Sequence, residues 1–357
     1  MDIGIQTTTI ILISGILSFI SNLFLLKFTR HCHILNKFKG RNFEQTKIPR
    51  LGGITIVISM LISLLIIRCL SGKAFTVINE NVSYTVLFIA GLIILLIGIY
   101  DDLLGANAFK KFFFQIIAAG IVYFGGFKIA GISIPFIGTK SLGFQLLSFI
   151  LTIIWIVGIT NAVNILDGLD GLAVGVSFFA ALSLGVLAFL SGQYFIVIII
   201  AALLGSMIGF YPFNFPKAKM YLGDSGSLLI GFLLASLSMI RIERKGSLAI
   251  ALMIPIIILL LPILETVVTI ARRIYGKKSI FQGDTDHFHY RFLKKGFSET
   301  KTTIYLTFLS FLFALTGILF EYVQTRIRLL LFVLIFLICF FLLHYLEYIN
   351  LRSREKA

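Results

Sequence analysis

Long apolar runs separated by short polar loops constrain the fold of this 357-residue chain more than any other feature. Mean hydropathy is +1.02, and 13% of residues are charged, about half the share in soluble domains. About 20 apolar residues let an α-helix cross a bilayer. The pattern therefore predicts an all-α integral membrane protein, a polytopic bundle of about 11 transmembrane helices. The segments expected to form them are about 8–28, 52–70, 83–100, 112–126 (short, and able to tilt), 142–159, 172–190, 194–210, 226–240, 247–270, 303–320 and 329–346.

Loop charge predicts how this bundle is oriented. Lysine and arginine concentrate in cytoplasmic loops, and 22 of the 31 here lie in the odd-numbered loops and the C-terminal tail. We expect the N-terminus outside and the C-terminus in the cytoplasm, although Arg241, Arg244 and Lys245 fall on the outer side. The N-terminus lacks a basic region followed by a small-residue cleavage site, so the first segment is expected to remain as a helix. Residues 1–357 then form one multi-pass domain in the cytoplasmic membrane.

The net charge of +15 is explained by the same topology signal, which also favours anionic lipid headgroups, so we expect no nucleic-acid partner. The three cysteines, Cys32, Cys69 and Cys339, are scattered along the chain. Their odd number and wide spacing predict neither a disulfide framework nor a cysteine metal site.

Five polar or glycine-rich segments interrupt the apolar pattern, and all lie in or beside odd-numbered loops. The loops that carry them are about 29–51, 100–111, 160–171, 211–227 and 271–302. The orientation rests on lysine and arginine alone, so the gathering of these segments at the cytoplasmic face is partly independent support for a single site there. The segments are Lys47-Ile48-Pro49-Arg50-Leu51-Gly52-Gly53, Tyr100-Asp101-Asp102, Asn161 to Gly171, Asn214 to Ser227, and Asp286-His287-Phe288-His289-Tyr290-Arg291.

Acidic residues gather in these segments although the chain has only 16 of them. Neighbouring carboxylates repel one another, so their clustering favours a bound cation. Mg²⁺ often takes one or two carboxylates and completes its shell with water and phosphate oxygens, which suits a diphosphate substrate. The five acids are Asp101, Asp102, Asp167, Asp170 and Asp224.

Structural explanations of these residues stay open at this point. Asp101 and Asp102 also fit a solvated helix end before a turn at Gly105. Asp224 also fits an N-cap of the eighth apolar segment, and a Gly/Ser-rich helix start suits phosphate as well. His287 and His289 are either incidental histidines of a solvated basic loop or part of an anion-binding flap.

Glu265 lies inside the ninth apolar segment, close to Pro262. Proline is expected to kink this helix. A buried acid near a kink is a functional candidate, and a structural partner among the basic residues of the ninth loop explains it equally well.

Five motifs follow one another along the chain: Pro-x-x-Gly-Gly, Asp-Asp, Asn-x-x-Asn-x-x-Asp-Gly-x-Asp-Gly-Leu, Gly-Asp-x-Gly-Ser and His-x-His. In this order, the motifs resemble those of the polyprenyl-phosphate N-acetylhexosamine-1-phosphate transferases. They extend from residue 47 to about 299. The resemblance implies transfer of a sugar 1-phosphate from a UDP-N-acetylhexosamine to a polyprenyl phosphate, here undecaprenyl phosphate, with release of UMP. It also implies a Mg²⁺ requirement, with Mn²⁺ as a substitute, and allows a homodimer.

Residue roles follow from the same resemblance. Asp224 matches the magnesium aspartate, and Asp102 helps to hold the metal. Asp101 matches the base or positioning group for the lipid phosphate. The implied catalytic residues are Asp101, Asp102, Asp170, Asp224 and His289. The implied nucleotide-sugar-binding residues are Lys47, Arg50, Asn161, Asn164, Asp167, Asn214, Tyr221, His287 and Arg291, among which Asp167 and Tyr221 would recognise the uracil.

Two motifs point away from the branch that acts on UDP-MurNAc-pentapeptide, which typically has Thr-Pro-Thr-Met-Gly-Gly and three consecutive histidines. Here Ile48-Pro49-Arg50-Leu51-Gly52-Gly53 and the His-x-His motif resemble the enzymes that start O-antigen, common antigen or teichoic acid synthesis with GlcNAc-1-phosphate. That branch often has His-x-His-His, and Tyr290 replaces the last histidine. Transfer of phospho-MurNAc-pentapeptide stays the alternative within the family. The alternatives from other classes are a membrane transporter and a non-catalytic scaffold or lipid-binding protein, but a transporter needs its acids near the bilayer centre.

Overall fold

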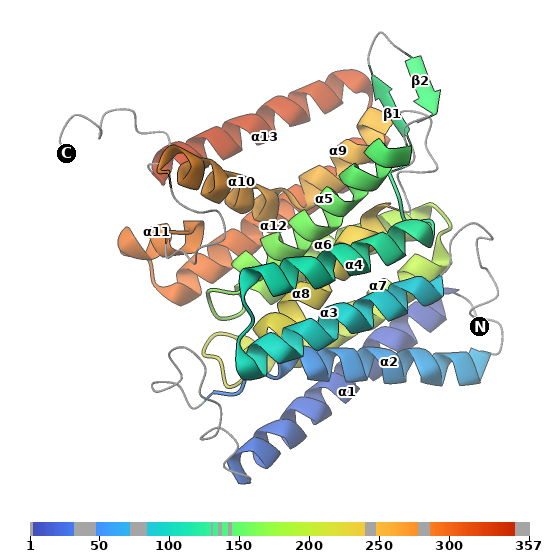
Figure 1. The fold of residues 1–357 in the computed structure, drawn as a ribbon, viewed down its shortest axis with the longest axis vertical. Coiled ribbons are helices and arrows are strands. Elements are labelled where there is room, and N and C mark those ends of the chain that lie inside the picture. The colour runs from blue at the N-terminus through green and yellow to red at the C-terminus, as the bar shows by residue number, and fades with distance from the viewer. Residues whose placement is uncertain are drawn as a thin grey trace.

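The computed structural model describes residues 3–31, 48–71, 84–129, 131–134, 138–141, 145–239, 248–277 and 286–346, and nearly all of them are helical (Figure 1). The all-α prediction is confirmed, apart from one short antiparallel hairpin in which Gly131 pairs with Ser141. The hairpin strands are β1 (Gly131–Ile134) and β2 (Gly138–Ser141). The helices are α1 (Ile3–His31), α2 (Gly52–Ser71), α3 (Tyr84–Leu104), α4 (Ala108–Phe124), α5 (Gln145–Ile165), α6 (Leu172–Leu190), α7 (Tyr194–Asn214), α8 (Gly223–Met239), α9 (Leu248–Ile258), α10 (Leu260–Tyr275), α11 (Phe288–Lys294), α12 (Glu299–Tyr322) and α13 (Thr325–Tyr345).

Each predicted apolar segment contains a helix, but the ninth contains two. The helix is interrupted at Leu259, between α9 and α10. Pro262 lies in the first turn of α10, where its missing N–H costs no intrahelical bond, so the predicted kink is present as a helix boundary. Within the described residues, eight helices are long and apolar enough to cross a membrane. The protein is therefore a multi-pass membrane protein, while the count of eleven spans and the orientation stay predictions.

Helices α7 and α8 form the centre of the bundle and are almost entirely buried. Small residues let other helices approach them closely. A Cβ at Gly205 of α7 would overlap the Ile11 carbonyl of α1. Nearby, the Ser14 hydroxyl donates to the Ala202 carbonyl at 2.7 Å. Close packing and interhelical hydrogen bonds are the usual sources of helix association in a bilayer, where the hydrophobic effect no longer favours it.

Helices α2, α3 and α5 pack around α8. Glycines bring the first two against its N-terminal end. A Cβ on Gly53 would overlap the backbone nitrogen of Gly226, and a Cβ on Gly98 would lie 2.5 Å from the Cα of Ser225. The start of α8 is therefore enclosed by neighbouring backbones, and side chains around it are held in fixed positions.

The polar segments meet at one end of the bundle. In Figure 1 the α3–α4 and α5–α6 turns and α11 lie on the left, and the β1–β2 hairpin lies at the opposite end. Helix α1 begins on the right and α13 ends on the left, as an odd number of crossings requires. The described parts of all five predicted polar segments thus share one end, which is the end that the charge pattern assigns to the cytoplasm.

Candidate active site

A backbone clamp places the segment from Pro49 to Gly53 beside the start of α8. The N–H of Tyr221 donates to the Pro49 carbonyl at 2.9 Å, and the N–H of Gly52 donates back to the Tyr221 carbonyl at 3.1 Å. A further bond joins Gly53 to Leu222 at 2.9 Å. The glycine pair is needed because a side chain at either position would overlap neighbouring atoms. The clamp sets Arg50 and Tyr221 on the wall of one cavity.

Asp102 caps the N-terminus of α8 from the neighbouring helix α3. Its Oδ1 accepts the N–H of Asp224 at 2.8 Å, and its Oδ2 accepts the N–H of Ser225 at 2.9 Å. Gly223 has a left-handed backbone (φ +75°), and a Cβ there would lie 2.7 Å from Asp102 Oδ2. A carboxylate at this place satisfies free N–H groups and complements the helix dipole. The structure thus gives Asp102 a positioning role, and direct metal binding by Asp102 stays a prediction.

Asp224 lies in the first turn of α8, and its carboxylate faces side chains of other helices. Its Oδ2 accepts from Lys111 Nζ at 2.7 Å and from Asn164 Nδ2 at 3.1 Å. Lys111 Nζ also lies 3.3 Å from Asp101 Oδ2. Asp101 Oδ1 accepts the N–H of Ala106, which follows the α3–α4 turn, at 2.6 Å. An ammonium group therefore occupies a cation position between two carboxylates.

Asp170 and Asn214 connect the loops around this centre. Asp170 Oδ2 accepts the N–H of Ala218 at 2.8 Å. Asn214 accepts the N–H of Gly171 at 3.0 Å and donates to the Met220 carbonyl at 3.1 Å. These contacts tie the α5–α6 loop to the α7–α8 loop. Their geometry is structural, although Asp170 also lines a cavity.

Asp167 follows the end of α5 and lines two cavities at this end of the bundle. Burial raises its pKa well above the usual range, and the nearby carboxylates of Asp224 and Asp102 raise it further, while Arg50 lowers it. Burial also raises the pKa of Tyr221, with a contribution from Asp170. The carboxyl of Asp167 is therefore suited to hydrogen bonding as an acid as well as an anion.

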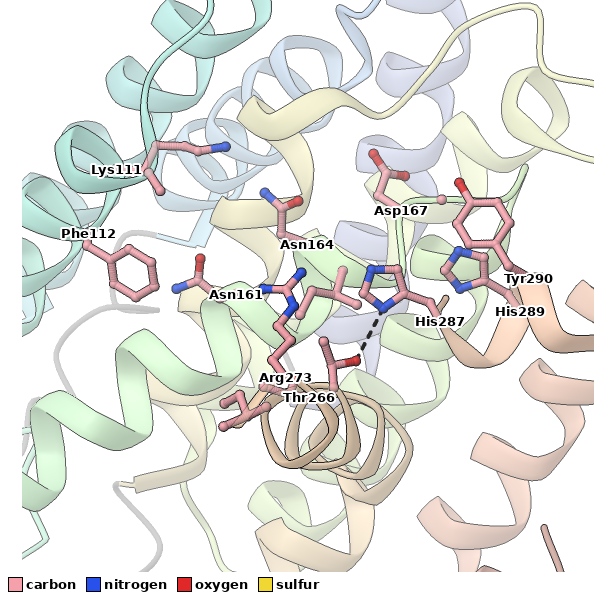
Figure 2. A pocket seen from close by; sticks show the side chains of 15 residues that line it. Lys111, Phe112, Asn161, Asn164, Asp167, Thr266, Arg273, His287, His289 and Tyr290 are labelled. Atoms are coloured by element: carbon pink, nitrogen blue, oxygen red, sulfur yellow. Dashed lines mark hydrogen bonds between the residues drawn. The ribbon is translucent and has the colours of Figure 1, made fainter. Parts of the chain in front are cut away.

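The flap at α11 brings His287, His289 and Tyr290 to the same centre from the other side (Figure 2). His289 is fully buried, and neither ring nitrogen has a hydrogen-bond partner among the described residues. Burial, with a smaller contribution from the neighbouring His287, lowers the pKa of His289 to about 3. A Cβ on Gly168 would overlap its Nε2. His289 is thus a neutral ring pressed against the loop that carries Asp167.

Arg291 contacts Asp286 and the end of α13. Its Nε and Nη2 donate to Asp286 at 3.1 and 2.7 Å, and its Nη1 donates to the Leu346 carbonyl at the end of α13 at 2.7 Å. Burial tends to raise the pKa of Asp286, but bonds from Arg291 and Lys294 outweigh it and lower the pKa to about 2. Arg291 lines neither cavity. The structure assigns it to the connection between α11 and α13, and its predicted donor contact stays a prediction.

Two cavities meet at this end of the bundle. One, of about 450 Å³, is polar and includes Arg50, Asp170, Tyr221, Asp224 and Glu299. The other, of about 410 Å³, opens between α4, α5, α10 and the flap and includes Lys111, Asn161, Arg273 and His287. Figure 2 shows Lys111, Asn164 and Arg273 directed into it from three different helices. Asn164, Asp167, Gly168 and Tyr290 line both cavities.

Most of the predicted residues converge here, and several contributors were not predicted. Lys47 lies outside the described residues. Asn161 is held through its Nδ2, which donates to Gln115 Oε1 at 2.6 Å. Lys111 and Gln115 of α4, Arg273 of α10 and Glu299 of α12 were missed. Only Lys111 had a usable signal, because it is a basic residue that follows the Asp101-Asp102 pair after a short connection.

The comparisons with known proteins agree with this picture. The model of glycosyl transferase family 4 matches residues 84–242. The chain is 33% identical over 301 residues to the probable undecaprenyl-phosphate N-acetylglucosaminyl 1-phosphate transferase of Bacillus subtilis (strain 168), covering 84% of this chain and 80% of that protein.

Two further relatives have names that differ from that of the Bacillus subtilis protein. A decaprenyl-phosphate N-acetylglucosaminephosphotransferase of Mycobacterium leprae is 33% identical over 286 residues, covering 74% of this chain and 71% of that protein. A phospho-N-acetylmuramoyl-pentapeptide-transferase of Listeria monocytogenes is 33% identical over 312 residues, covering 83% and 90%. These matches extend over most of each protein. The chain belongs to glycosyl transferase family 4.

Proposed function

We propose that this protein transfers N-acetylglucosamine 1-phosphate from UDP-GlcNAc to undecaprenyl phosphate in the cytoplasmic membrane, with release of UMP on the cytoplasmic side. This is the reaction class named for the relatives from Bacillus subtilis and Mycobacterium leprae. It would start the synthesis of a cell-envelope polysaccharide.

The observation that carries the proposal is that two cavities meet beside the ammonium group of Lys111, which lies between Asp101 and Asp224. A polar cavity with Tyr221 and Arg50 suits a uridine diphosphate sugar, because an aromatic ring and a guanidinium complement a base and a phosphate. The second cavity, which has Lys111 and Arg273, suits an acceptor phosphate whose lipid tail remains in the bilayer. Their common wall is where the two substrates would react.

Magnesium, with manganese as a substitute, fits the residues at this wall. Lys111 already holds a positive charge between Asp101 and Asp224. Within the described ranges, no group of three or more His, Cys, Asp or Glu side chains could hold a metal. Asp224 would therefore supply the main protein ligand, with water and phosphate oxygens completing the shell, as is common for Mg²⁺. Once bound, the ion offsets negative charge on the diphosphate.

The reaction we favour is a single displacement. An oxygen of the acceptor phosphate bonds to the β-phosphorus of the donor, and the bond to the bridging oxygen breaks, so that UMP leaves. Asp101, which contacts Ala106 and Lys111, would act on the acceptor phosphate. Positioning and charge stabilisation then supply most of the rate enhancement, as in other phosphoryl transfers.

The test is release of UMP from UDP-GlcNAc by the purified protein in nanodiscs, with and without undecaprenyl phosphate and Mg²⁺. We expect release only when both are present. Asp224→Asn should abolish it while the thermal unfolding temperature stays within a few degrees of wild type. Release without acceptor, or exchange of labelled UMP into the donor in its absence, would overturn the single displacement.

The same assay separates the competing functions. UDP-GalNAc and UDP-MurNAc-pentapeptide test other donors, the latter because one relative is named for that pentapeptide transfer. No turnover with any of the three donors, despite a folded protein, would refute the transferase proposal and leave a transporter or scaffold. A homodimer, suggested by the family resemblance, stays a prediction for cross-linking in the membrane.

A further inference from the structure

Glu265 is a carboxylate buried inside the bundle, with 1% of its surface exposed, on α10. Burial of an acid is unfavourable unless it is hydrogen-bonded. Its partners belong to the flap and not to its own helix. Oε1 lies 3.0 Å from His287 Nδ1 and accepts the N–H of Phe288 at 2.9 Å, and Oε2 lies 3.2 Å from the same N–H. One side chain therefore holds both the imidazole and the backbone at the start of α11.

The contact selects one ring nitrogen of His287. A carboxylate has only acceptor atoms, so the hydrogen between Glu265 Oε1 and His287 belongs to Nδ1. The Thr269 hydroxyl, 3.3 Å from the same Nδ1, makes a second and longer contact. Nε2 is then the nitrogen that is left for the cavity, which His287 lines and toward which its ring is directed in Figure 2.

The contact also fixes the position of α11. His287 is the N-cap residue of this helix, and its side chain makes no capping bond. Glu265 supplies that bond from α10. His289 and Tyr290 follow directly, with the His287 and His289 rings stacked at 5.6 Å and the His289 and Tyr290 rings 4.3 Å apart. A shift of the first turn of α11 would move all three rings relative to Asp167 and Gly168.

We propose that Glu265 is a positioning residue of the transferase: it holds Nδ1–H of His287 toward α10, presents Nε2 to the substrate cavity, and sets the place of His289 and Tyr290. This rests on the proposed function, since Glu265 does not line either cavity and acts on turnover only through the flap. A carboxylate that orients a histidine in this way keeps the imidazole ring in one tautomer.

The direct test is nuclear magnetic resonance of protein with ¹⁵N-labelled histidine in nanodiscs, with the His287 signals identified by their loss in His287→Gln. We expect protonated Nδ1 and unprotonated Nε2 in the neutral wild-type ring. In Glu265→Gln the amide offers a donor as well as an acceptor, and the Nδ1–H form should lose its preference. A wild-type ring protonated at Nε2 would overturn the proposal, and this measurement needs no enzymatic activity.

Turnover gives the second readout. Glu265→Gln should lower kcat at least about tenfold, as loss of orienting partners does at other sites, while the KM for UDP-GlcNAc changes less than twofold. Glu265→Asp, which keeps the carboxylate, should recover part of the loss. The double variant Glu265→Gln with His287→Gln should lose no more kcat than the worse single variant.

Unchanged kcat in Glu265→Gln, or fully additive losses in the double variant, would refute the proposal. Inactivity of the wild type would instead refute the transferase function.

Discussion

Lys111 donates a 2.7 Å hydrogen bond from its ammonium group to the carboxylate of Asp224. The pair joins α4 to α8 through two residues that are 113 positions apart in the chain, and it forms where the two cavities approach each other. Asp101 lies 3.3 Å from the same ammonium. The position that Lys111 occupies between two carboxylates is therefore one that also suits a divalent cation, while its ammonium group is suited to contact a substrate phosphate.

Replacement of Lys111 by methionine should lower UMP release at least about 100-fold, because a charge aimed at a phosphate is lost. It should not weaken binding of Mn²⁺, measured by electron paramagnetic resonance, since Lys111 and the ion compete for Asp224. Lys110→Met is the matched control, because Lys110 lies over the Tyr100 ring and outside both cavities. A tenfold weaker Mn²⁺ affinity in Lys111→Met would contradict this account.

Asp102→Ala should reduce stability as well as activity. The change leaves the N–H groups of Asp224 and Ser225 without their acceptors, and each such buried donor costs about 1–3 kcal/mol. We expect a lower unfolding temperature in thermal denaturation, with Asp102→Asn in between because its amide has one acceptor oxygen. If Asp102 acts mainly as a cap, Asp102→Asn still binds Mn²⁺; complete loss of Mn²⁺ with normal stability would establish it as a metal ligand instead.

His289 should make stability depend on pH. Its pKa in the folded protein is about 3, below the ordinary value of 6.5, so the unfolded chain binds the proton first. The contribution of His289 to stability is then complete above about pH 6.5 and falls as the pH drops toward 3, by on the order of 2 kcal/mol at pH 5. Because Asp167, whose pKa is raised, acts in the opposite direction, the prediction concerns the difference between wild type and His289→Phe in thermal unfolding between pH 4.5 and 7.5. Above pH 4.5 Asp286, with a pKa of about 2, stays ionised and adds nothing. An equal slope in both proteins would exclude His289 as the cause.

The helices could be predicted because apolar length alone specifies them in a bilayer, and each predicted segment contains one. The division of the ninth segment was only partly predictable: Pro262 indicated a break, but the boundary at Leu259 depends on how α9 and α10 pack. The β1–β2 hairpin and α11 carry no comparable apolar signal. The family motifs located the end of the bundle where the site lies.

Residue roles were harder to predict because they depend on contacts across the chain. The partner of Asp102 is the start of α8, 122 residues away, so its capping role has no local signature. The same holds for Pro49 and Tyr221, whose backbones pair directly. The family resemblance implied donor binding by Arg291, and no sequence signal indicated that its guanidinium donates to Asp286 and to the end of α13. Sequence motifs thus identified which residues matter better than what each one contacts.

Gly168→Ala tests the fit between the flap and the α5–α6 loop without removing any functional group. A Cβ at Gly168 would overlap Nε2 of the buried His289, so the ring or the whole of α11 has to move. We expect UMP release to fall at least about tenfold, because small displacements of positioned groups cost much of the rate. Gly158→Ala on α5 is the control, since no atom lies within 4 Å of its added Cβ and alanine favours a helix. The double variant Gly168→Ala with His289→Ala should lose no more activity than His289→Ala alone, because the clash disappears with the ring. Full activity of Gly168→Ala would show that His289 tolerates displacement, and the close contact would then have no part in turnover.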